Sequence, residues 1–193
     1  MTKNDAKEIA SIHSLAFPNF FLTALGEQVL KVFYASLIED KGTIASAVKE
    51  NNSIVGFFVA STEPNGLYAR IFKKNISSFF FPLTLAFLKR PSLLKRMIVS
   101  FTSTKSHNVP DNAIPALLSI CVKPDSAGKG VGKVLIGELE KALIAQSKNG
   151  YYLTTDADNN IATNQFYLKN GFQLYSSFFQ GKRRMNLYTK YFS

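Results

Sequence analysis

A glycine-rich stretch about two-thirds of the way along the chain constrains the fold more than any other feature. It runs through residues 124–133 and places glycines at alternate positions near its end. The largely apolar residues before it, 113–122, are typical of a buried strand. After it, apolar residues recur at helical spacing over 131–143, with charged residues between them. The sequence therefore predicts a strand, a glycine-rich turn and an amphipathic helix, in that order.

A turn of this kind is suited to an anionic group. Gly128, Gly130 and Gly132 permit positive φ and close approach of the backbone. The free N–H groups and the dipole of the helix that follows favour negative charge. Because Lys129 and Lys133 add positive charge beside the turn, a pyrophosphate is the expected guest.

Two common phosphate-binding motifs do not fit. A Walker A loop needs four residues between its first glycine and the Gly-Lys pair, followed by Ser or Thr. Here only three residues separate Gly128 from Gly132, and Val134 follows Lys133. The dinucleotide fingerprint would place its third glycine where Lys133 stands, and it belongs near the start of a Rossmann domain. A βα turn without a ligand is the remaining alternative.

The stretch resembles the acyl-CoA-binding motif of the GNAT superfamily of N-acetyltransferases. That motif runs Gln/Arg-x-x-Gly-x-Gly/Ala, and residues 127–132 match both of its small positions. Ala127 departs from the usual Gln or Arg. This change weakens the expected binding of phosphate more than it weakens the match to the motif.

A second feature of the same superfamily follows downstream. The family often shows Asn, then Ala, then Tyr-x-x-x-Gly-Phe, and this pattern matches at Asn160, Tyr167, Gly171 and Phe172. Thr163 replaces the Ala. The two features occur in the expected order and spacing, so together they identify the chain as resembling a GNAT protein.

The resemblance implies an α/β GNAT fold: a mixed, strongly twisted sheet flanked by helices on both faces, with a helical insert before the central strand. One domain would cover residues 1–193, and 65–112 would be a basic, aromatic insert. Acetyl-CoA, the implied cosubstrate, would lie in the split between the strand ending at Val122 and a parallel strand ending near Thr155. The implied contacts are Ile120, Cys121 and Val122 in the strand, Gly128, Lys129, Gly130, Val131, Gly132 and Lys133 in the turn, and Asn160, Tyr167 and Lys169 downstream.

The resemblance also implies the chemistry. Tyr167 matches the family tyrosine that protonates the departing thiolate, and a phenol of pKa ~10 is well matched to an alkyl thiol. An N–H of the strand at 120–122 would polarise the thioester carbonyl. The general base is not identified, and no metal is expected. The candidates for the base are Asp156, His107, His13 or a water chain that requires none of them.

The expected acceptor is a primary amine of a small molecule. Aromatic faces suit a sugar or nucleobase and arginines suit a phosphate, so an amino sugar on a nucleotide or another anionic carrier is favoured. A protein or peptide amine is an alternative, as is a CoA-binding module without catalysis. The candidate contacts are Phe17, Asn19, Phe20 and Phe21, which could equally staple two packed helices, and Lys182, Arg183 and Arg184.

Composition narrows the class of protein. The chain has 193 residues, of which 46% are hydrophobic and 19% charged, as in a globular domain. Its one cysteine, Cys121, excludes an internal disulfide and is expected to be an inert buried residue rather than an acyl carrier. With no secretory leader at the start, a cytoplasmic location is expected. The net charge of +10 favours anionic partners, but the cations are dispersed, so no nucleic-acid partner is expected. A homodimer is left open.

Periodicity and turn residues predict the remaining elements. The usual first strand of the family is stunted or absent, which would expose a sheet edge. An apolar run at 78–88 contains Pro82 and is too short to span a bilayer. It is interpreted as a helical insert packed over the sheet, with a membrane-surface helix as the alternative. Helices are expected at 5–13 and 22–38. Antiparallel hairpins are expected to pair 43–49 with 54–61 and 174–179 with 184–191. Helix caps are expected at Asn149-Gly150, Asn160 and Asn170-Gly171.

Overall fold

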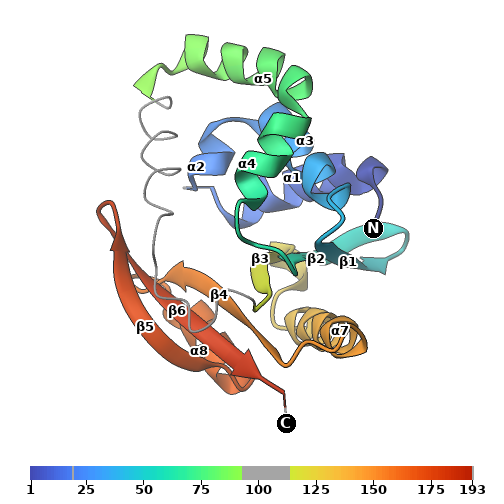
Figure 1. The fold of residues 1–193 in the computed structure, drawn as a ribbon, viewed down its shortest axis with the longest axis vertical. Coiled ribbons are helices and arrows are strands. Elements are labelled where there is room, and N and C mark those ends of the chain that lie inside the picture. The colour runs from blue at the N-terminus through green and yellow to red at the C-terminus, as the bar shows by residue number, and fades with distance from the viewer. Residues whose placement is uncertain (19, 93–113, 193) are drawn as a thin grey trace.

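The computed structural model describes residues 1–18, 20–92 and 114–192. These residues form a six-stranded sheet of order β1-β2-β3-β4-β6-β5, which twists strongly from one edge to the other (Figure 1). Only β3 and β4 are parallel, and the other neighbours are antiparallel. The strands are β1 (Thr43–Glu50), β2 (Ser53–Ser61), β3 (Ala116–Val122), β4 (Gly150–Asp156), β5 (Gln173–Gln180) and β6 (Arg183–Tyr191).

Helices cover both faces of this sheet. On one face α1 and α3 share a core with Phe57 and Val59 of β2, and α4 and α5 join that core through Leu67, Ile71 and Phe79. On the other face α7 packs against Val55 and Phe58 of the same strand, and α8 joins this second core through Tyr167. The mixed sheet, the two helical layers and the helical insert before β3 are therefore confirmed. The helices are η1 (Lys3–Asp5), α1 (Ala6–Ala16), α2 (Phe21–Ala24), α3 (Glu27–Ile38), α4 (Leu67–Lys74), α5 (Ile76–Lys89), η2 (Pro124–Ser126), α7 (Val131–Ala145) and α8 (Ile161–Lys169).

Three local expectations were wrong. The single helix at 22–38 is two helices, because Gly26 has a φ of 96° and ends the helical path between α2 and α3. The helix α7 ends at Ala145, and its left-handed residue is Ser147 rather than the Asn149-Gly150 pair. Gly150 instead begins β4, where a Cβ would lie 2.7 Å from the carbonyl oxygen of Lys190. Gly150 is therefore a glycine because β4 and β6 pack closely there, a reason that its neighbours in the sequence do not reveal.

The third correction concerns Asn160 at the start of α8. It occupies the cap position, but its side chain accepts no hydrogen bond from the helix. Its Nδ2 donates instead to Thr155 Oγ1 and to the carbonyl oxygen of Asp156, at 2.9 and 3.1 Å. The cap at Asn170-Gly171 is confirmed, with Gly171 at a φ of 83°.

The expected loss of the first strand is confirmed within the described residues. The chain enters α1 through the short η1 helix, and β1 forms the edge of the sheet with only β2 beside it. The expected hairpins also form, with Asn51 and Asn52 at φ values of 48° and 66° in the turn between β1 and β2.

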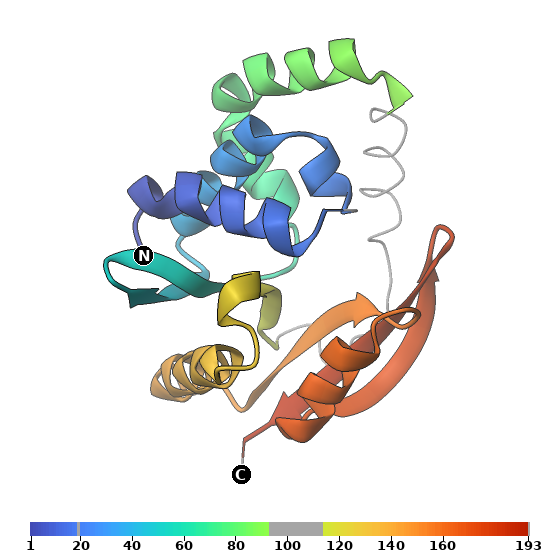
Figure 2. The ribbon, with the colours of Figure 1, turned by 180° about the vertical axis from the view of Figure 1, so that it is seen from behind.

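The parallel pair of strands separates early. Only Ala116 with Tyr152 and Leu117 with Leu153 are in register between β3 and β4. On the other side of β3, the pairing with β2 steps from Ser119 to Leu117, so Leu118 is an extra residue in β3. Such a bulge bends its strand and increases the twist. The bend begins where the pairing with β4 ends, and the two strands diverge from there (Figure 2).

The insert between β2 and β3 forms two helices in its described part. Arg70 of α4 donates from Nε and a terminal guanidinium nitrogen to both carboxylate oxygens of Asp40, at 2.9 and 3.0 Å, which ties the insert to the end of α3. The helix α5 lies across the outer end of the helical layer, beyond α3 and α4 (Figures 1 and 2). Residues 93–112 of the expected insert lie outside the described residues, and so do Lys95, Arg96 and His107. In the described ranges, no helix is long and apolar enough to cross a membrane.

Candidate active site

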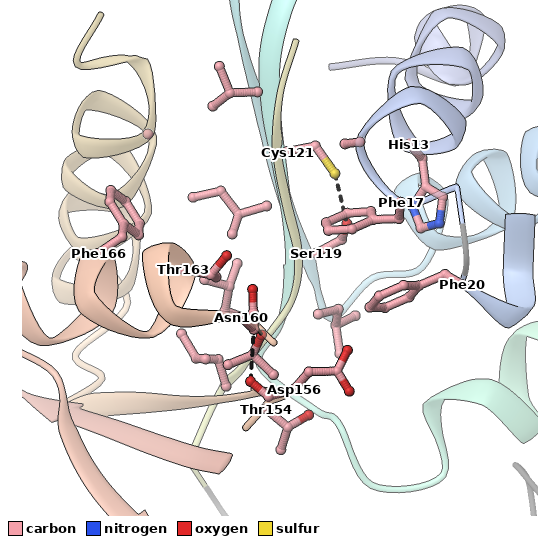
Figure 3. Close-up of a pocket in the computed structure, with 18 of the residues that line it drawn as sticks. His13, Phe17, Phe20, Ser119, Cys121, Thr154, Asp156, Asn160, Thr163 and Phe166 are labelled. Atoms are coloured by element: carbon pink, nitrogen blue, oxygen red, sulfur yellow. Dashed lines mark hydrogen bonds between the residues drawn. The ribbon is translucent and has the colours of Figure 1, made fainter. Parts of the chain in front are cut away.

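A cleft of about 1330 Å³ opens where β3 and β4 separate. Its walls come from the turn before α7, from α8, from the diverging ends of β3 and β4, and from α1 and the residues that follow it (Figure 3). In Figure 3, Asn160, Thr163 and Phe166 lie on one side of the cleft, and His13, Phe17 and Phe20 lie on the other. The volume exceeds that of a usual small-ligand pocket, so an elongated ligand and a second molecule can share it.

Most of the predicted site residues meet in this cleft. All of the predicted CoA contacts line it except Lys129, which is exposed outside it. Of the predicted acceptor contacts, Phe17, Phe20, Phe21 and Arg183 line it. Lys182 and Arg184 are not among the lining residues, and Asn19 lies outside the described residues. Two base candidates, Asp156 and His13, also line the cleft, whereas His107 is not described.

The glycine-rich turn presents bare backbone to the cleft. Gly128 and Gly130 have φ values of 76° and 83°, and a Cβ at either would meet no atom within 4 Å. Gly132 has a different role, since a Cβ there would lie 3.1 Å from the ring of Phe166 in α8. The N–H of Val134 makes a bond to the carbonyl oxygen of Gly130 as α7 begins. The N–H groups at 131–133 therefore precede the regular helical bonds and lie at the positive end of the helix dipole.

The edge of β3 that faces β4 continues the same wall. Beyond Leu117 this edge has no strand partner among the described residues, because the register with β4 ends there. Ile120, Cys121 and Val122 lie on this free stretch and line the cleft. Across from them, Asn160 donates hydrogen bonds from Nδ2 to the end of β4, while its Oδ1 has no hydrogen-bond partner within the described ranges. The split thus offers backbone and amide groups of both polarities to a ligand that lies along it.

Tyr167 lines the cleft, and its side chain is buried. The ring packs against Phe166, Phe172 and Tyr188 with centroids 5.4, 5.3 and 5.8 Å away. Burial raises the pKa of its phenol well above the usual value, and the nearby Cys121 and Tyr188 raise it further. Tyr167 is therefore protonated at neutral pH and can act as a proton donor.

A chain of hydrogen bonds crosses the opposite wall, and it was not predicted from the sequence. His13 Nδ1 lies 2.7 Å from the hydroxyl of Tyr34, which lies 3.0 Å from Ser119 Oγ. Ser119 Oγ is 3.7 Å from the sulfur of Cys121 on the same strand. All four residues line the cleft. A serine within the apolar run of β3 is the one sequence signal for this network, and nothing local marks Tyr34 as its partner.

The other ring nitrogen of His13 is left unused. The side chain is 4% exposed, and Nε2 is buried without a hydrogen-bond partner among the described groups. Burial lowers the pKa of His13 from 6.5 to about 4, so the imidazole is neutral at pH 7. Buried polar atoms in proteins rarely lack a partner, so Nε2 marks a place where a ligand or water belongs.

Asp156 is not a free base. Its two carboxylate oxygens accept from Nε and a terminal guanidinium nitrogen of Arg183, at 2.9 and 2.7 Å. The guanidinium carbon of Arg183 also lies 4.9 Å above the ring of Phe20. This stack joins the end of β4 and the terminal hairpin to the aromatic wall that follows α1.

Cys121 has the environment of an inert thiol. It is buried, and burial raises its pKa to about 12. The thiolate is the nucleophilic form, so at neutral pH this cysteine offers almost none of it. This supports the expectation that Cys121 carries no acyl group.

Comparisons with known proteins support the resemblance that the two motifs imply. Residues 97–174 match the family model described as the acetyltransferase (GNAT) domain. No curated protein sequence matches the chain. The cleft and the split sheet belong to a fold shared with solved acetyltransferase structures, and the sequence match to the GNAT domain covers residues 97–174 of the 193-residue chain, in line with the expected resemblance.

Three solved structures show the extent of the likeness. The aminoglycoside 6'-acetyltransferase type Ii is 14% identical, with a TM-score of 0.63, and the likeness covers 99% of this chain and 94% of that one. The PaiA N-acetyltransferase from Thermoplasma acidophilum, in complex with coenzyme A, is also 14% identical, with a TM-score of 0.61 and coverage of 100% and 96%. The ribosomal-protein-S18-alanine N-acetyltransferase from Escherichia coli is 14% identical, with a TM-score of 0.59 and coverage of 98% and 88%. At these identities the likeness shows the fold alone.

The buried His13 gives a prediction about acid stability. Its pKa in the folded chain is about 4, below the usual 6.5, so between these two pH values the unfolded chain binds a proton that the folded chain does not. Stability is therefore fully present above pH 6.5 and falls as the pH drops toward 4. We expect His13 to contribute about 2.5 kcal/mol to the loss between pH 7 and pH 4.5. Urea unfolding at both pH values measures it, with His13→Gln as the comparison. An equal loss in both proteins would show that His13 does not titrate in this window.

Proposed function

We propose that this chain is an acetyl-CoA-dependent N-acetyltransferase that acts on a primary amine of a small molecule. The observation that carries the proposal is the single cleft in which a free strand edge, a glycine turn at a helix start and Tyr167 come together. The alternatives are a protein or peptide N-acetyltransferase and a CoA-binding protein without catalysis. The reduced, buried Cys121 is in keeping with the cytoplasm as the site of action.

The residues present fit acetyl-CoA. The bare backbone at Gly128 and Gly130 leaves room for a pyrophosphate against the N–H groups at the start of α7. Lys133 and Lys169 line the same cleft and make no ion pair with a carboxylate in the described residues, so both are placed to meet phosphate groups. The free edge at 120–122 and the Oδ1 of Asn160 would bond the amide groups of the pantetheine arm.

The reaction needs three things from the protein. Acetyl-CoA supplies an activated acetyl group, and the chain must orient it, stabilise charge on its carbonyl oxygen and protonate the sulfur that leaves. A backbone N–H on the free stretch of β3 would meet the carbonyl oxygen. The neutral phenol of Tyr167 would give its proton to the sulfur, and a group with a raised pKa does so only as strong negative charge develops there.

The removal of the amine proton falls to water in this proposal. Both oxygens of Asp156 are engaged by Arg183. The pKa of His13 is about 4, far below the ~10 of an alkyl ammonium, and moving a proton between them would cost about 8 kcal/mol. His13 is therefore a poor base, but its neutral Nε2 can hold a neutral amine by a hydrogen bond. The amine would bind in its free-base form and attack the thioester carbonyl. It would then lose one N–H proton to solvent in the open cleft.

The acceptor side favours an amine with a flat or apolar body. The rings of Phe17 and Phe20 lie 4.8 Å apart on this wall, and Phe21 also lines it. These faces support an amino sugar or a nucleobase conjugate. The anionic carrier has less support, because the charge of Arg183 is met by Asp156 and neither Lys182 nor Arg184 lines the cleft. The similar folds include an aminoglycoside acetyltransferase and a ribosomal-protein acetyltransferase. Both sugar amines and protein amines should therefore be tested as acceptors.

Binding of CoA is the first test. Isothermal titration should show binding to the wild-type chain and none to Gly130→Glu, because a side chain at a φ of 83° strains the turn and its charge repels phosphate. Gly137→Glu is the matched control: it adds the same charge to the middle of α7, where a Cβ meets nothing within 4 Å. We expect Gly137→Glu to bind normally. Absence of binding by the wild type would remove the whole proposal.

The role of Tyr167 is tested by the loss of its hydroxyl. Tyr167→Phe keeps the packed ring and should lower kcat by about 10²-fold or more, with little change in acetyl-CoA affinity. Tyr188→Phe is the control, because its hydroxyl donates to Asn164 Oδ1 at 2.8 Å and serves the fold. Steady-state release of CoA thiol measures both. An unchanged kcat in Tyr167→Phe would leave water as the acid.

The acceptor class is decided by a panel. Release of CoA thiol should be measured with amino sugars, their nucleotide conjugates, polyamines, amino acids and peptides. We expect turnover with aminated sugars, and a higher KM in Phe20→Ala because the aromatic wall loses a ring. Turnover confined to peptides would overturn this acceptor while leaving the acetyl-CoA site intact.

A further inference from the structure

The helix α5 carries more apolar side chains than the described residues cover. Phe79 is 1% exposed and packs into the main core. Leu83, Ala86 and Phe87 pack against α2 and α3. Five other large apolar side chains of the helix remain exposed: Ile76, Phe80, Phe81, Leu85 and Leu88.

These five residues, called here the α5 stripe, recur at helical spacing along one side. Ile76, Phe80 and Leu88 follow a ridge of fourth residues, and Phe81 and Leu85 follow the adjacent ridge. Phe80, Phe81 and Leu88 are each more than 70% exposed, at 71, 72 and 78%. Single exposed apolar residues are ordinary, but a contiguous apolar strip on a packed helix marks a surface that binds something.

The charged residues next to this stripe in the chain are all cations. Lys73 and Lys74 lie in the last turn of α4 just before it, and Lys89 and Arg90 lie at its end. All four are exposed, and none pairs with a carboxylate in the described parts of the chain. The sequence has no Asp or Glu between Glu63 and Asp111. Arg70 of α4, by contrast, is held by Asp40.

We propose that the α5 stripe and its flanking cations dock the protein on an anionic membrane surface. Exposed aromatic and aliphatic side chains enter the boundary between headgroups and acyl chains, and lysines and arginines beside them meet lipid phosphates. Since the other face of α5 is packed into the domain, the helix would lie flat in the interface as part of a folded protein. No segment would cross the bilayer.

Two other occupants fit the surface less well. A second copy of this chain would meet α5 across a twofold axis, and would bring the same four cations against one another without any acidic residue on α4 or α5 to pair them. Nucleic acid would satisfy the cations, but its backbone gives no apolar region to cover Phe80, Phe81 and Leu88. A membrane of negative lipids satisfies both the charge and the apolar stripe.

Co-sedimentation with vesicles tests the proposal on the full chain. We expect binding to phosphatidylcholine vesicles that contain about 30% phosphatidylglycerol, and much weaker binding to phosphatidylcholine alone. The double variant Phe80→Ser with Phe81→Ser should lower the partition coefficient at least ~10-fold. The triple variant Lys73→Glu, Lys89→Glu and Arg90→Glu should lower it as much and remove the preference for negative lipid.

The control carries equivalent changes on a different surface. Ile144 in α7 is 56% exposed and Lys141 of the same helix is also exposed, so Ile144→Ser with Lys141→Glu should bind vesicles as the wild type does. Thermal unfolding should be close to wild type in every variant, since all of the altered side chains are exposed. No binding by the wild type, or loss of binding in the control to the same extent, would overturn the proposal. A dimer or a DNA complex that is lost in the α5 variants, without vesicle binding by the wild type, would overturn it in favour of that partner.

Discussion

The structure depends on the early separation of β3 from β4. Two parallel strands in the middle of a sheet would normally satisfy each other along their whole length. Here they keep only two residue pairs in register, and the extra residue Leu118 bends β3 away where the pairing stops. The same divergence leaves a strand edge without a partner and opens the cleft beside it. The sheet remains intact because β3 stays paired with β2 and β4 stays paired with β6.

The divergence also brings two different walls together. The wall made by the turn, α7 and α8 is rich in backbone donors and lysines, while the wall made by α1 and the residues after it is aromatic and carries His13. Close packing fixes the first wall, because Gly132 lets α7 meet the ring of Phe166 and Gly56 lets α7 meet β2. A Cβ at Gly56 would lie 2.8 Å from Val131 Cγ1, at the very start of the helix that would receive phosphate. The glycines therefore set the position of that helix as well as the conformation of the turn.

Sequence reasoning succeeded where the signal is local and failed where it is not. The apolar strand, the glycine turn and the helix from Val131 each leave a mark within about ten residues, and the order of these marks predicted the elements that line the cleft. No glycine or proline lies next to Leu118, so the sequence gives no sign of the bulge there. The contacts of His13 with Tyr34 and of Arg183 with Asp156 join residues 21 and 27 positions apart, so nothing in the neighbourhood of any one of them predicts the pair. Arg183 was accordingly assigned to an acceptor phosphate, although its charge is already met within the fold.

Burial acts on the ionisable groups of the cleft in one direction, toward the neutral form. It lowers the pKa of His13 and raises those of Tyr167, Tyr34 and Cys121. A cleft lined in this way holds no strong base and no thiolate at neutral pH, so its side chains act through hydrogen bonds and through the phenol as a proton donor. Neutral groups also impose no penalty on a neutral amine, whereas an ammonium would lose its hydration and find no unpaired carboxylate among the lining residues that the structure describes, except the exposed Asp158. The burial that weakens His13 as a base thus favours the form of the acceptor that can attack an acetyl group.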